Sequence, residues 1–438
     1  MGKAPSYKGK EIALYTYSDL ITYTPVKESF DTVNVDGTFE LSTIIKNPQA
    51  CNIKIDNQVG KLYMLTLFKY GIVFPAPDTA EYQNPNTDHS IDLVINGDST
   101  ELNARIIDFN QQFDFFWAKN YKYFVTKKIH HKLDSFQLKM EKRYEYVKSW
   151  YFKKYMKYTF ALINDNTGRH RSYLMQYYIM NEPILYQNYE YMEFFNQFFN
   201  HYLLKQTTGK FGSEFLDYIN VEPSYTGLNS SLKKDPWLEQ DSLRELVILK
   251  GLYELYYVPK FSKENIITIV EEIRQTTKIE EHKTIADNIL RIFKNLKVGV
   301  SAPLFSLNDS KGKLHLLEDY KNKYVYLDFF SPKNLESQQE MKKLEQIKSK
   351  YNDKVIFISI CAEGSEEEFK EFVKKNPKYN WLLLYGAKDK KLLENYLIKA
   401  PATYYLINRE GFLVQSPAPK PSQGIELKFK EMFREKKR

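Results

Sequence analysis

The spacing of apolar residues changes twice along this chain, and no other feature limits its fold as strongly. Up to about residue 98, apolar and polar residues alternate in short runs, which is the period of a strand with one buried face. From residue 99 the apolar residues recur every three to four positions, as on an amphipathic helix. After residue 298, strand-like runs alternate with helical segments. The pattern therefore predicts a multidomain protein with parts at 8–98, 99–297 and 298–438.

The first part is predicted to be a β-sandwich domain, because several short strands follow one another with turn residues between them. Asp36-Gly37 separates two of these runs and predicts a hairpin, since glycine accepts a positive φ without steric cost. The predicted strands span residues 11–17, 38–44, 52–55, 61–67 and 91–95.

The middle part is predicted to be an irregular α-helical domain. Its last helix ends near Gly299, because glycine is favoured just beyond a helix C-terminus. The sequence contains no repeat of fixed period, which argues against a solenoid. The first helix begins near residue 99 and buries one face, formed by Leu102, Ile106, Phe109 and Phe113. Further helices are predicted at 136–160, 169–180, 189–204, 241–257, 262–273 and 285–296.

The last part is predicted to be a compact α/β domain with a mixed sheet. Residues 324–330 are almost all apolar, as expected of a central strand that is covered on both faces. A hairpin turn is predicted at 408–411. The helix after the central strand is expected to bury one face, formed by Met341, Leu344 and Ile347. The other predicted elements are strands at 355–361, 381–385, 403–407 and 412–414 and helices at 366–374 and 424–434.

Several motifs of this last part occur in the order found in one known family. The motifs are Ala302-Pro303 followed by Phe305, Leu307, Asp309 and Gly312, then the run 327–330, the triplet 339–341 and the segment 400–411. Residues 298–438 therefore resemble the thioredoxin-like domain of TlpA-like proteins, within the AhpC/TSA superfamily. The Tyr-rich front of the chain resembles, more loosely, the accessory β and α-helical regions of long envelope members of that family.

The resemblance has a gap at the position that carries the family's chemistry. In that family, the strand matching 327–330 leads into a Cys-x-x-Cys motif at the start of a helix. The helix N-terminus lowers the pKa of the first thiol, and the second thiol resolves the mixed disulfide. Counting along the match places Asn334 and Ser337 at the two cysteine positions. An amide is not a nucleophile, and an unassisted serine hydroxyl is too poorly ionised to replace a thiolate. We therefore assign no catalytic residue and treat the redox motif as degenerate.

The only cysteines of the chain are Cys51 and Cys361. Cys361 ends the predicted strand 355–361, and free cysteines at such places are usually small buried hydrophobes. Two other roles stay open at this point: a redox or peroxidatic thiol, or a disulfide with Cys51. If this thiol is inert, we expect that the protein is not an enzyme. The alternative is a divergent thiol-disulfide oxidoreductase or peroxidase that uses Cys361 or a partner thiol.

The resemblance also places the family's cis-proline loop at Ala400, Pro401 and Ala402. In thioredoxin-like folds the backbone of this loop pairs with an extended peptide, a form of β-augmentation. The loop has two interpretations here: it is a retained peptide-binding edge, or it is simply part of the fold.

Charge and motifs exclude several other classes of function. Lys and Arg number 63 against 55 Asp and Glu, a mild excess that does not amount to a nucleic-acid footprint. No phosphate-binding glycine motif or nucleophile elbow occurs, and the seven histidines show no metal-ligand spacing, so no cofactor or metal is expected. No apolar run reaches the ~20 residues that span a bilayer. The aromatic and basic residues of 144–160 would suit single-stranded nucleic acid, but helical spacing predicts one core stripe, formed by Val147, Tyr151, Tyr155 and Tyr158.

These observations lead to one expectation and two alternatives about function. We expect a redox-inactive thioredoxin-like envelope protein that acts by protein binding or scaffolding, as an accessory subunit of a larger assembly. Its partners would be other envelope proteins, including an outer-membrane complex, and its 35 Tyr and 29 Phe suit such surfaces. The expected location is periplasmic or outer-membrane-associated, with an export signal that this sequence lacks, and a cytoplasmic location stays open. The alternatives are the oxidoreductase named above and a carbohydrate- or ligand-binding module in the β-sandwich.

Overall fold

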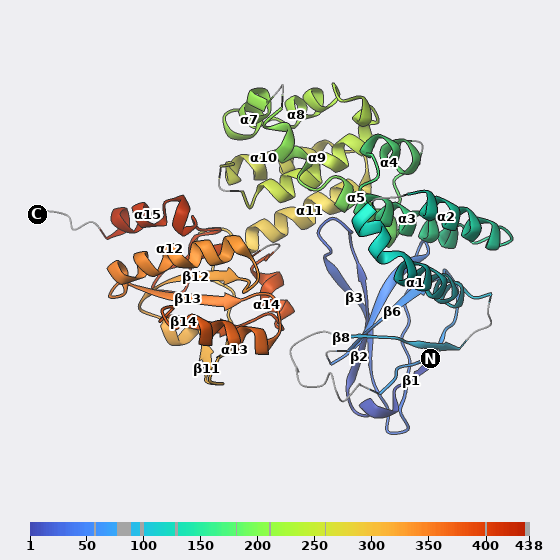
Figure 1. Ribbon diagram of the computed structural model, residues 1–438, viewed down its shortest axis with the longest axis horizontal. Helices are drawn as coiled ribbons and strands as arrows, with labels where there is room; N and C mark the ends of the chain where they lie inside the picture. The colour runs from blue at the N-terminus through green and yellow to red at the C-terminus, as the bar shows by residue number, and fades with distance from the viewer. Residues whose placement is uncertain are drawn as a thin grey trace, which may run out of the picture. The chain divides into compact units, whose positions relative to one another are not determined.

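The computed structural model describes residues 1–56, 58–76, 89–96, 100–127, 130–180, 182–209, 212–258, 260–398 and 401–433. The described residues form two compact units, 1–290 and 291–433, which are drawn from blue to yellow and from yellow to red in Figure 1. The first unit contains a sheet-rich N-terminal region and a helical middle region, and the second is an α/β domain. This confirms the predicted multidomain architecture with a helical middle. In the described part of the chain, no helix has both the length and the apolar character needed to cross a membrane.

The N-terminal region contains two sheets that both contribute buried side chains to one hydrophobic cluster. Alternation along the strands sets the buried face: Ile12 and Leu14 point into the cluster, as do Cys51, Ile53 and Ile55. The larger sheet has the order β3 (Pro25–Thr32), β2 (Glu11–Tyr17), β5 (Gln49–Ile55), β6 (Gln58–Met64) and β8 (His89–Ile91). The smaller sheet has the order β4 (Thr38–Phe39), β1 (Gly2–Lys3), β7 (Gly71–Val73) and β9 (Val94–Asn96).

Two strand predictions in this region were wrong in extent, and one long strand was missed. The predicted strand 38–44 is reduced to the short β4, and the predicted strand 91–95 is divided between β8 and β9. The missed strand is β3, which pairs with β2 and lies at the edge of the described sheet. Most of its side chains are exposed, so it lacks the apolar alternation that reveals a half-buried strand.

The middle region is built from helices, and its predicted core stripe is confirmed. Val147, Tyr151, Tyr155 and Tyr158 are all buried. The predicted helices 136–160 and 189–204 were wrong in one respect, because each is two helices. The first is interrupted before Ser149, whose hydroxyl accepts a hydrogen bond from the Phe152 N–H and caps a new helix. The second is interrupted at His201, which has a left-handed φ of 54°.

The helices of the first unit are α1 (Leu102–Lys127), α2 (His131–Arg143), α3 (Trp150–Asn166), α4 (Arg171–Tyr178), α5 (Tyr189–Phe198), α6 (Tyr202–Gln206), α7 (Gly212–Asn220), α8 (Tyr225–Leu232), α9 (Asp241–Leu255), α10 (Lys263–Thr276) and α11 (Glu280–Asn295), the last of which ends in the second unit.

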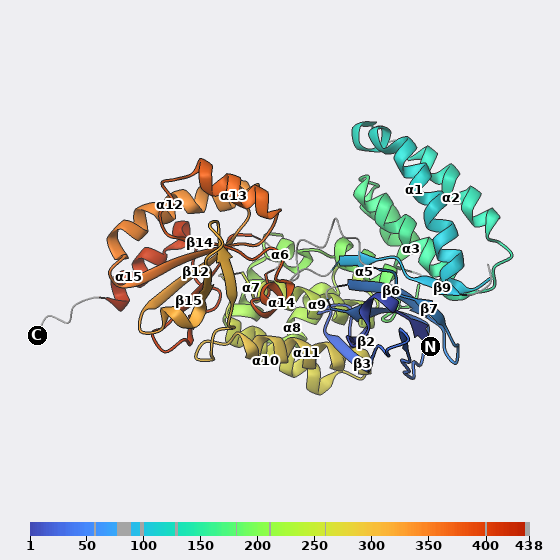
Figure 2. The same cartoon turned by 90° about the horizontal axis from the view of Figure 1, so that it is seen from below.

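The second unit contains one seven-stranded mixed sheet. Its order is β11 (Leu314–Leu316), β10 (Ser306–Asp309), β14 (Leu382–Tyr385), β13 (Val355–Cys361), β12 (Tyr324–Phe330), β15 (Thr403–Ile407) and β16 (Leu413–Gln415). The pairs β12–β13 and β13–β14 are parallel, and the other pairs are antiparallel. The helices are α12 (Leu335–Tyr351), α13 (Glu366–Lys375), α14 (Lys390–Asn395) and α15 (Ile425–Met432), seen beside the sheet in Figure 2. The mixed sheet predicted from the sequence is confirmed.

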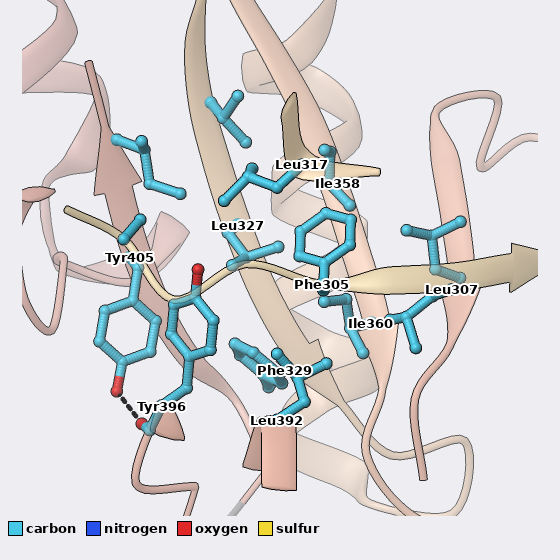
Figure 3. Close-up of a cluster of buried hydrophobic side chains, with 14 of the residues drawn as sticks. Phe305, Leu307, Leu317, Leu327, Phe329, Ile358, Ile360, Leu392, Tyr396 and Tyr405 are labelled. Carbon is cyan, nitrogen blue, oxygen red and sulfur yellow. Dashed lines mark hydrogen bonds between the residues drawn. The ribbon is translucent and has the colours of Figure 1, made fainter. Parts of the chain in front are cut away.

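Successive residues of the central strand β12 point to opposite faces of this sheet. Val325, Leu327 and Phe329 belong to the cluster shown in Figure 3, where the Tyr405 hydroxyl donates a hydrogen bond to the Tyr396 carbonyl. The opposite face is covered by α12 and α15, which contribute Leu344, Ile347, Ile425 and Phe429. Tyr326, Asp328 and Phe330 therefore face α12, and this face contains the candidate site.

Candidate functional site

Asn334 is the N-cap residue of α12. It has an extended backbone, with φ −82° and ψ 121°, and its Oδ1 accepts a 2.8 Å hydrogen bond from the Ser337 N–H. Asparagine is among the preferred N-cap residues because its side chain satisfies one of the free N–H groups of the first turn. The first predicted redox-motif position therefore forms a helix cap.

Ser337 lies one turn into the same helix and is fully buried. Its Oγ accepts a 3.3 Å hydrogen bond from the Ser331 N–H, at the point where β12 leads into the helix. The Gln338 side chain adds a second bond to this turn, from its Nε2 to the Pro332 carbonyl at 2.7 Å. The polar groups at the two degenerate motif positions thus both hold the connection between strand and helix.

The two residues between these positions are turned outward. Leu335 is 69% exposed, a high value for a leucine. Glu336 forms an ion pair with Lys420, 2.5 Å between Oε1 and Nζ. The outer surface of the site is therefore an apolar side chain beside a charged pair.

The proline loop lies at the same end of the sheet. Ala400 and its bond to Pro401 lie outside the described residues, so the predicted cis bond stays a prediction. Ala402 is buried, has a left-handed φ of 64°, and donates its N–H to the Phe329 carbonyl at 2.7 Å. Because that N–H is used within the sheet, a peptide bound along this loop would have to pair with other backbone groups.

A buried carboxyl group, which the sequence analysis did not single out, lies beneath the start of α12. Asp328 is fully buried in β12, and its Oδ2 accepts a 3.1 Å hydrogen bond from the Ser359 hydroxyl. Ser359 in turn accepts a 2.8 Å bond from the Trp381 indole N–H. The Asp328 Oδ1 has no hydrogen-bond partner among the described residues. The one available signal was a lone carboxylate inside the otherwise apolar run 324–330.

Burial is the main reason why the pKa of Asp328 is raised to about 8, and the nearby Glu340 carboxylate raises it further. The Ser359 hydrogen bond opposes these effects. Glu340 is itself buried in α12, and its Oε2 accepts a 2.9 Å bond from the Ser422 N–H. The inner side of the site thus holds a neutral acid at neutral pH.

Both cysteines are free and buried. The Cys361 thiol donates a 3.2 Å hydrogen bond to the Glu363 carbonyl, and burial raises its pKa to about 12. The Cys51 thiol donates to the Leu62 carbonyl at 3.2 Å in the other unit, and burial raises its pKa as well. The prediction that Cys361 is a buried small hydrophobe is confirmed. Reactive cysteines have the opposite properties, a lowered pKa and an accessible sulfur.

Among the described residues, no three or more His, Cys, Asp and Glu side chains gather in a way that could hold a metal ion.

Comparisons with known proteins agree with this geometry. A family model described as Thioredoxin-like, named Thioredoxin_8, matches residues 322–413. The thiol-disulfide oxidoreductase ResA of Bacillus cereus is 31% identical over 124 residues, which cover 28% of this chain and 70% of that protein. The thioredoxin-like protein YneN of Bacillus subtilis is 27% identical over 134 residues, or 29% of this chain and 76% of that protein.

Among solved structures, the thioredoxin domain of a thiol-disulfide oxidoreductase from Bacteroides vulgatus is 27% identical, with a TM-score of 0.28. It covers 31% of this chain, and 97% of that chain is matched. The resemblance inferred from the sequence motifs is confirmed: through its C-terminal unit, this chain, whose sequence contains no Cys-x-x-Cys pair, belongs to the thioredoxin-like family of the ResA thiol-disulfide oxidoreductases.

Proposed function

We propose that this protein is a redox-inactive member of its family that acts by binding other proteins in the cell envelope. The observation that carries the proposal is the pair Asn334 and Ser337 at the start of α12. Their side chains are committed to capping the helix and closing the turn before it. A thiol-disulfide exchange needs a thiolate at this point, and neither side chain can form one.

The properties of Cys361 support the same proposal over the alternative of a divergent oxidoreductase or peroxidase. Its thiol is buried and hydrogen-bonded, and its pKa is raised to about 12 by burial. A thiolate would therefore be a minor species at neutral pH, and it would have no access to a substrate disulfide.

The binding surface that we propose is the exposed end of the site. Leu335 supplies apolar area, and the ion pair of Glu336 with Lys420 supplies a polar rim. Interfaces commonly have this composition, an apolar centre with charged groups around it. Pro401 and Ala402 lie at the same end of the sheet, so a peptide-binding edge at the proline loop belongs to the same proposal.

The other parts of the chain have a supporting role in this proposal. We infer a division into a β-sandwich at 8–98, a helical domain at 99–297 and the thioredoxin-like domain at 298–438. The first two would hold the third within a larger envelope assembly, in the periplasm or at the outer membrane. The partners are then other envelope proteins.

Site-specific photocrosslinking tests the proposal directly. A benzophenone amino acid placed at position 335 in the full-length protein should crosslink one partner in intact cells of the source organism. The matched control is Leu314 on the edge strand β11, which is 56% exposed in the same unit. Crosslinking at 335 but not at 314 supports the proposed surface, and equal crosslinking at both positions contradicts it.

Enzyme assays test the other half of the proposal. The purified protein should not accelerate insulin reduction by dithiothreitol and should not turn over hydrogen peroxide. Turnover that is lost in a Cys361→Ser variant would instead establish the alternative.

A further inference from the structure

The loop that follows β6, residues 65–70, projects an apolar side chain into solvent. Leu67 is fully exposed and has a left-handed φ of 57°, a backbone conformation that is strained for any residue but glycine. The loop is nevertheless fixed, because the Tyr70 hydroxyl accepts a 2.7 Å hydrogen bond from the Leu65 N–H and donates one of 3.2 Å to the Tyr63 carbonyl. The exposure of Leu67 is therefore a property of the folded loop.

Contacts with Tyr63, near the end of β6, bring two helices to this loop. The Tyr63 ring lies 6.0 Å from the ring of Tyr151 in the first turn of α3. The Tyr63 backbone forms two hydrogen bonds with the Asn103 side chain at the start of α1. Two residues further along α1, the Arg105 guanidinium donates a 3.4 Å hydrogen bond to the Tyr146 hydroxyl, just before α3. The loop and the starts of both helices therefore share one surface.

Large apolar and aromatic side chains are exposed on this surface. Besides Leu67, these are Phe68 and Trp150, each 47% exposed, and Tyr146, which is 70% exposed. Trp and Tyr combine an apolar ring with a polar atom, so they are favoured at the boundary between hydrocarbon and water. A fully exposed leucine surrounded by such rings matches the change of polarity across a lipid surface. We call these four side chains the β6-end patch.

The charges beside the β6-end patch are mainly positive. Lys69 follows Phe68 in the loop, Lys148 lies between Tyr146 and Trp150, and both lysines are exposed. Arg105 is the third cation, and Glu145 is the exposed carboxylate beside Tyr146. The excess of cations attracts a negatively charged surface.

Two other carboxylates lie near the start of α1, and both are compensated. Glu101 is buried, and its oxygens accept hydrogen bonds from the Asn103 and Ala104 N–H groups. Asp108 forms an ion pair with Arg143, 3.2 Å between Oδ2 and the guanidinium. Neither carboxylate therefore cancels the positive charge beside the β6-end patch.

The kind of cation favours a lipid over a protein as the occupant. Lysine is depleted at the centres of protein–protein interfaces. Beside a membrane, its long apolar stem can lie along the hydrocarbon boundary while the ammonium group reaches the lipid phosphates. Two of the three cations here are Lys69 and Lys148.

We propose that the β6-end patch binds the surface of an anionic lipid bilayer. Leu67 and Phe68 enter the outer part of the hydrocarbon, and Tyr146 and Trp150 lie among the headgroups. The three cations contact lipid phosphates. The proposal goes beyond the protein-binding function and does not depend on it, because the patch and the site at the start of α12 belong to different units.

Co-sedimentation of the full-length protein with sucrose-loaded vesicles tests the proposal. Vesicles that contain equal amounts of phosphatidylcholine and phosphatidylglycerol should bind the protein. Vesicles of phosphatidylcholine alone should bind it about tenfold more weakly, because the cations then meet no net charge. Leu67→Ser should weaken binding to the mixed vesicles about tenfold, as expected when one leucine no longer enters hydrocarbon.

Val35→Ser is the matched control for Leu67→Ser. Val35 is 87% exposed in the loop after β3, and that loop and residues 65–70 leave the larger sheet at opposite ends. This change should leave vesicle binding as it is. The double variant Lys69→Gln with Lys148→Gln should weaken binding to the mixed vesicles and leave binding to phosphatidylcholine unchanged.

Fluorescence quenching by brominated phosphatidylglycerol gives a second measurement. The lipid should quench part of the tryptophan emission, and Trp150→Phe should lose that part. The proposal is overturned if the mixed vesicles do not bind the protein, if phosphatidylcholine alone binds it as tightly, or if Val35→Ser weakens binding as much as Leu67→Ser. Equal quenching of Trp150→Phe and the unaltered protein would also overturn it. A patch that binds a protein instead of lipid would give the first of these outcomes.

Discussion

The Oδ1 atom of Asn334 accepts a 2.8 Å hydrogen bond from the backbone N–H of Ser337. The two positions that the family resemblance assigns to reactive cysteines are therefore joined to each other as a helix cap. The cap uses the same feature that redox chemistry would use, because the free N–H groups of a helix start stabilise either a side-chain oxygen or a thiolate. In this chain the feature contributes to stability.

Replacing the cap should destabilise the protein. We expect Asn334→Ala to lower the free energy of unfolding by about 1 kcal/mol, since one N–H of the first turn loses its partner. Asn334→Ser should cost less, because serine is also a good N-cap residue. Urea unfolding of the three proteins measures the difference. Equal stability of the alanine and serine variants would show that the cap contributes nothing.

Introducing cysteines at positions 334 and 337 should give the protein thiol-disulfide exchange activity. In the double variant Asn334→Cys with Ser337→Cys, the two cysteines are three residues apart at the start of α12 and within disulfide reach. The helix N-terminus should lower the pKa of the first thiol, so we expect insulin reduction by the double variant. Each single variant is the control and should stay inactive. A double variant that forms no disulfide, shown by alkylation of both new thiols and the matching gain in mass without prior reduction, would mean that this turn cannot support the chemistry.

Much of the α/β unit could be predicted from the sequence, for a physical reason. The strands β12 and β13 coincide with the predicted runs 324–330 and 355–361 because a central strand covered on both faces appears as a continuous apolar run. The edge strand β3 was missed because its exposed side chains leave no such pattern. The break between α2 and α3 was also missed, because apolar spacing continues across it while only the Ser149 cap marks it.

In the candidate site, too, the sequence located residues but not the contacts that they form. Counting from a motif was enough to locate Asn334 and Ser337, but their hydrogen bonds depend on how β12 turns into α12. The burial of Asp328 beside Ser359 depends on strand register, because the two residues are 31 positions apart and meet only when β12 pairs with β13.

Asp328 should make the protein less stable as the pH rises. The raised pKa, about 8 in the folded protein against an ordinary value of 3.8, means that the unfolded chain loses its proton first. The resulting loss of unfolding free energy is absent below pH 3.8, grows between that value and about pH 8, and then levels off. Between the two pKa values the free energy of unfolding falls by at most about 1.4 kcal/mol per pH unit. Asp328→Asn removes this titration, so its unfolding free energy should depend less on pH.

Urea unfolding at several pH values between the two pKa values compares Asp328→Asn with the unaltered protein. The expected result is a stability difference that shifts in favour of the variant as the pH rises. Parallel curves would mean that Asp328 is ionised in the folded state and that its burial is compensated.

The two thiols should be unreactive until the protein unfolds. Burial raises the pKa of Cys361 to about 12 and raises that of Cys51, and both sulfurs donate hydrogen bonds to backbone carbonyls. The folded protein should therefore react very slowly with Ellman's reagent at mildly alkaline pH, whereas the protein in guanidinium chloride should release two equivalents at once. A Cys51→Ala variant isolates the reaction of Cys361 and a Cys361→Ala variant isolates that of Cys51. Rapid release of one equivalent from folded Cys51→Ala would identify Cys361 as an accessible nucleophile, and the case for a protein that works through contact alone would fail at that residue.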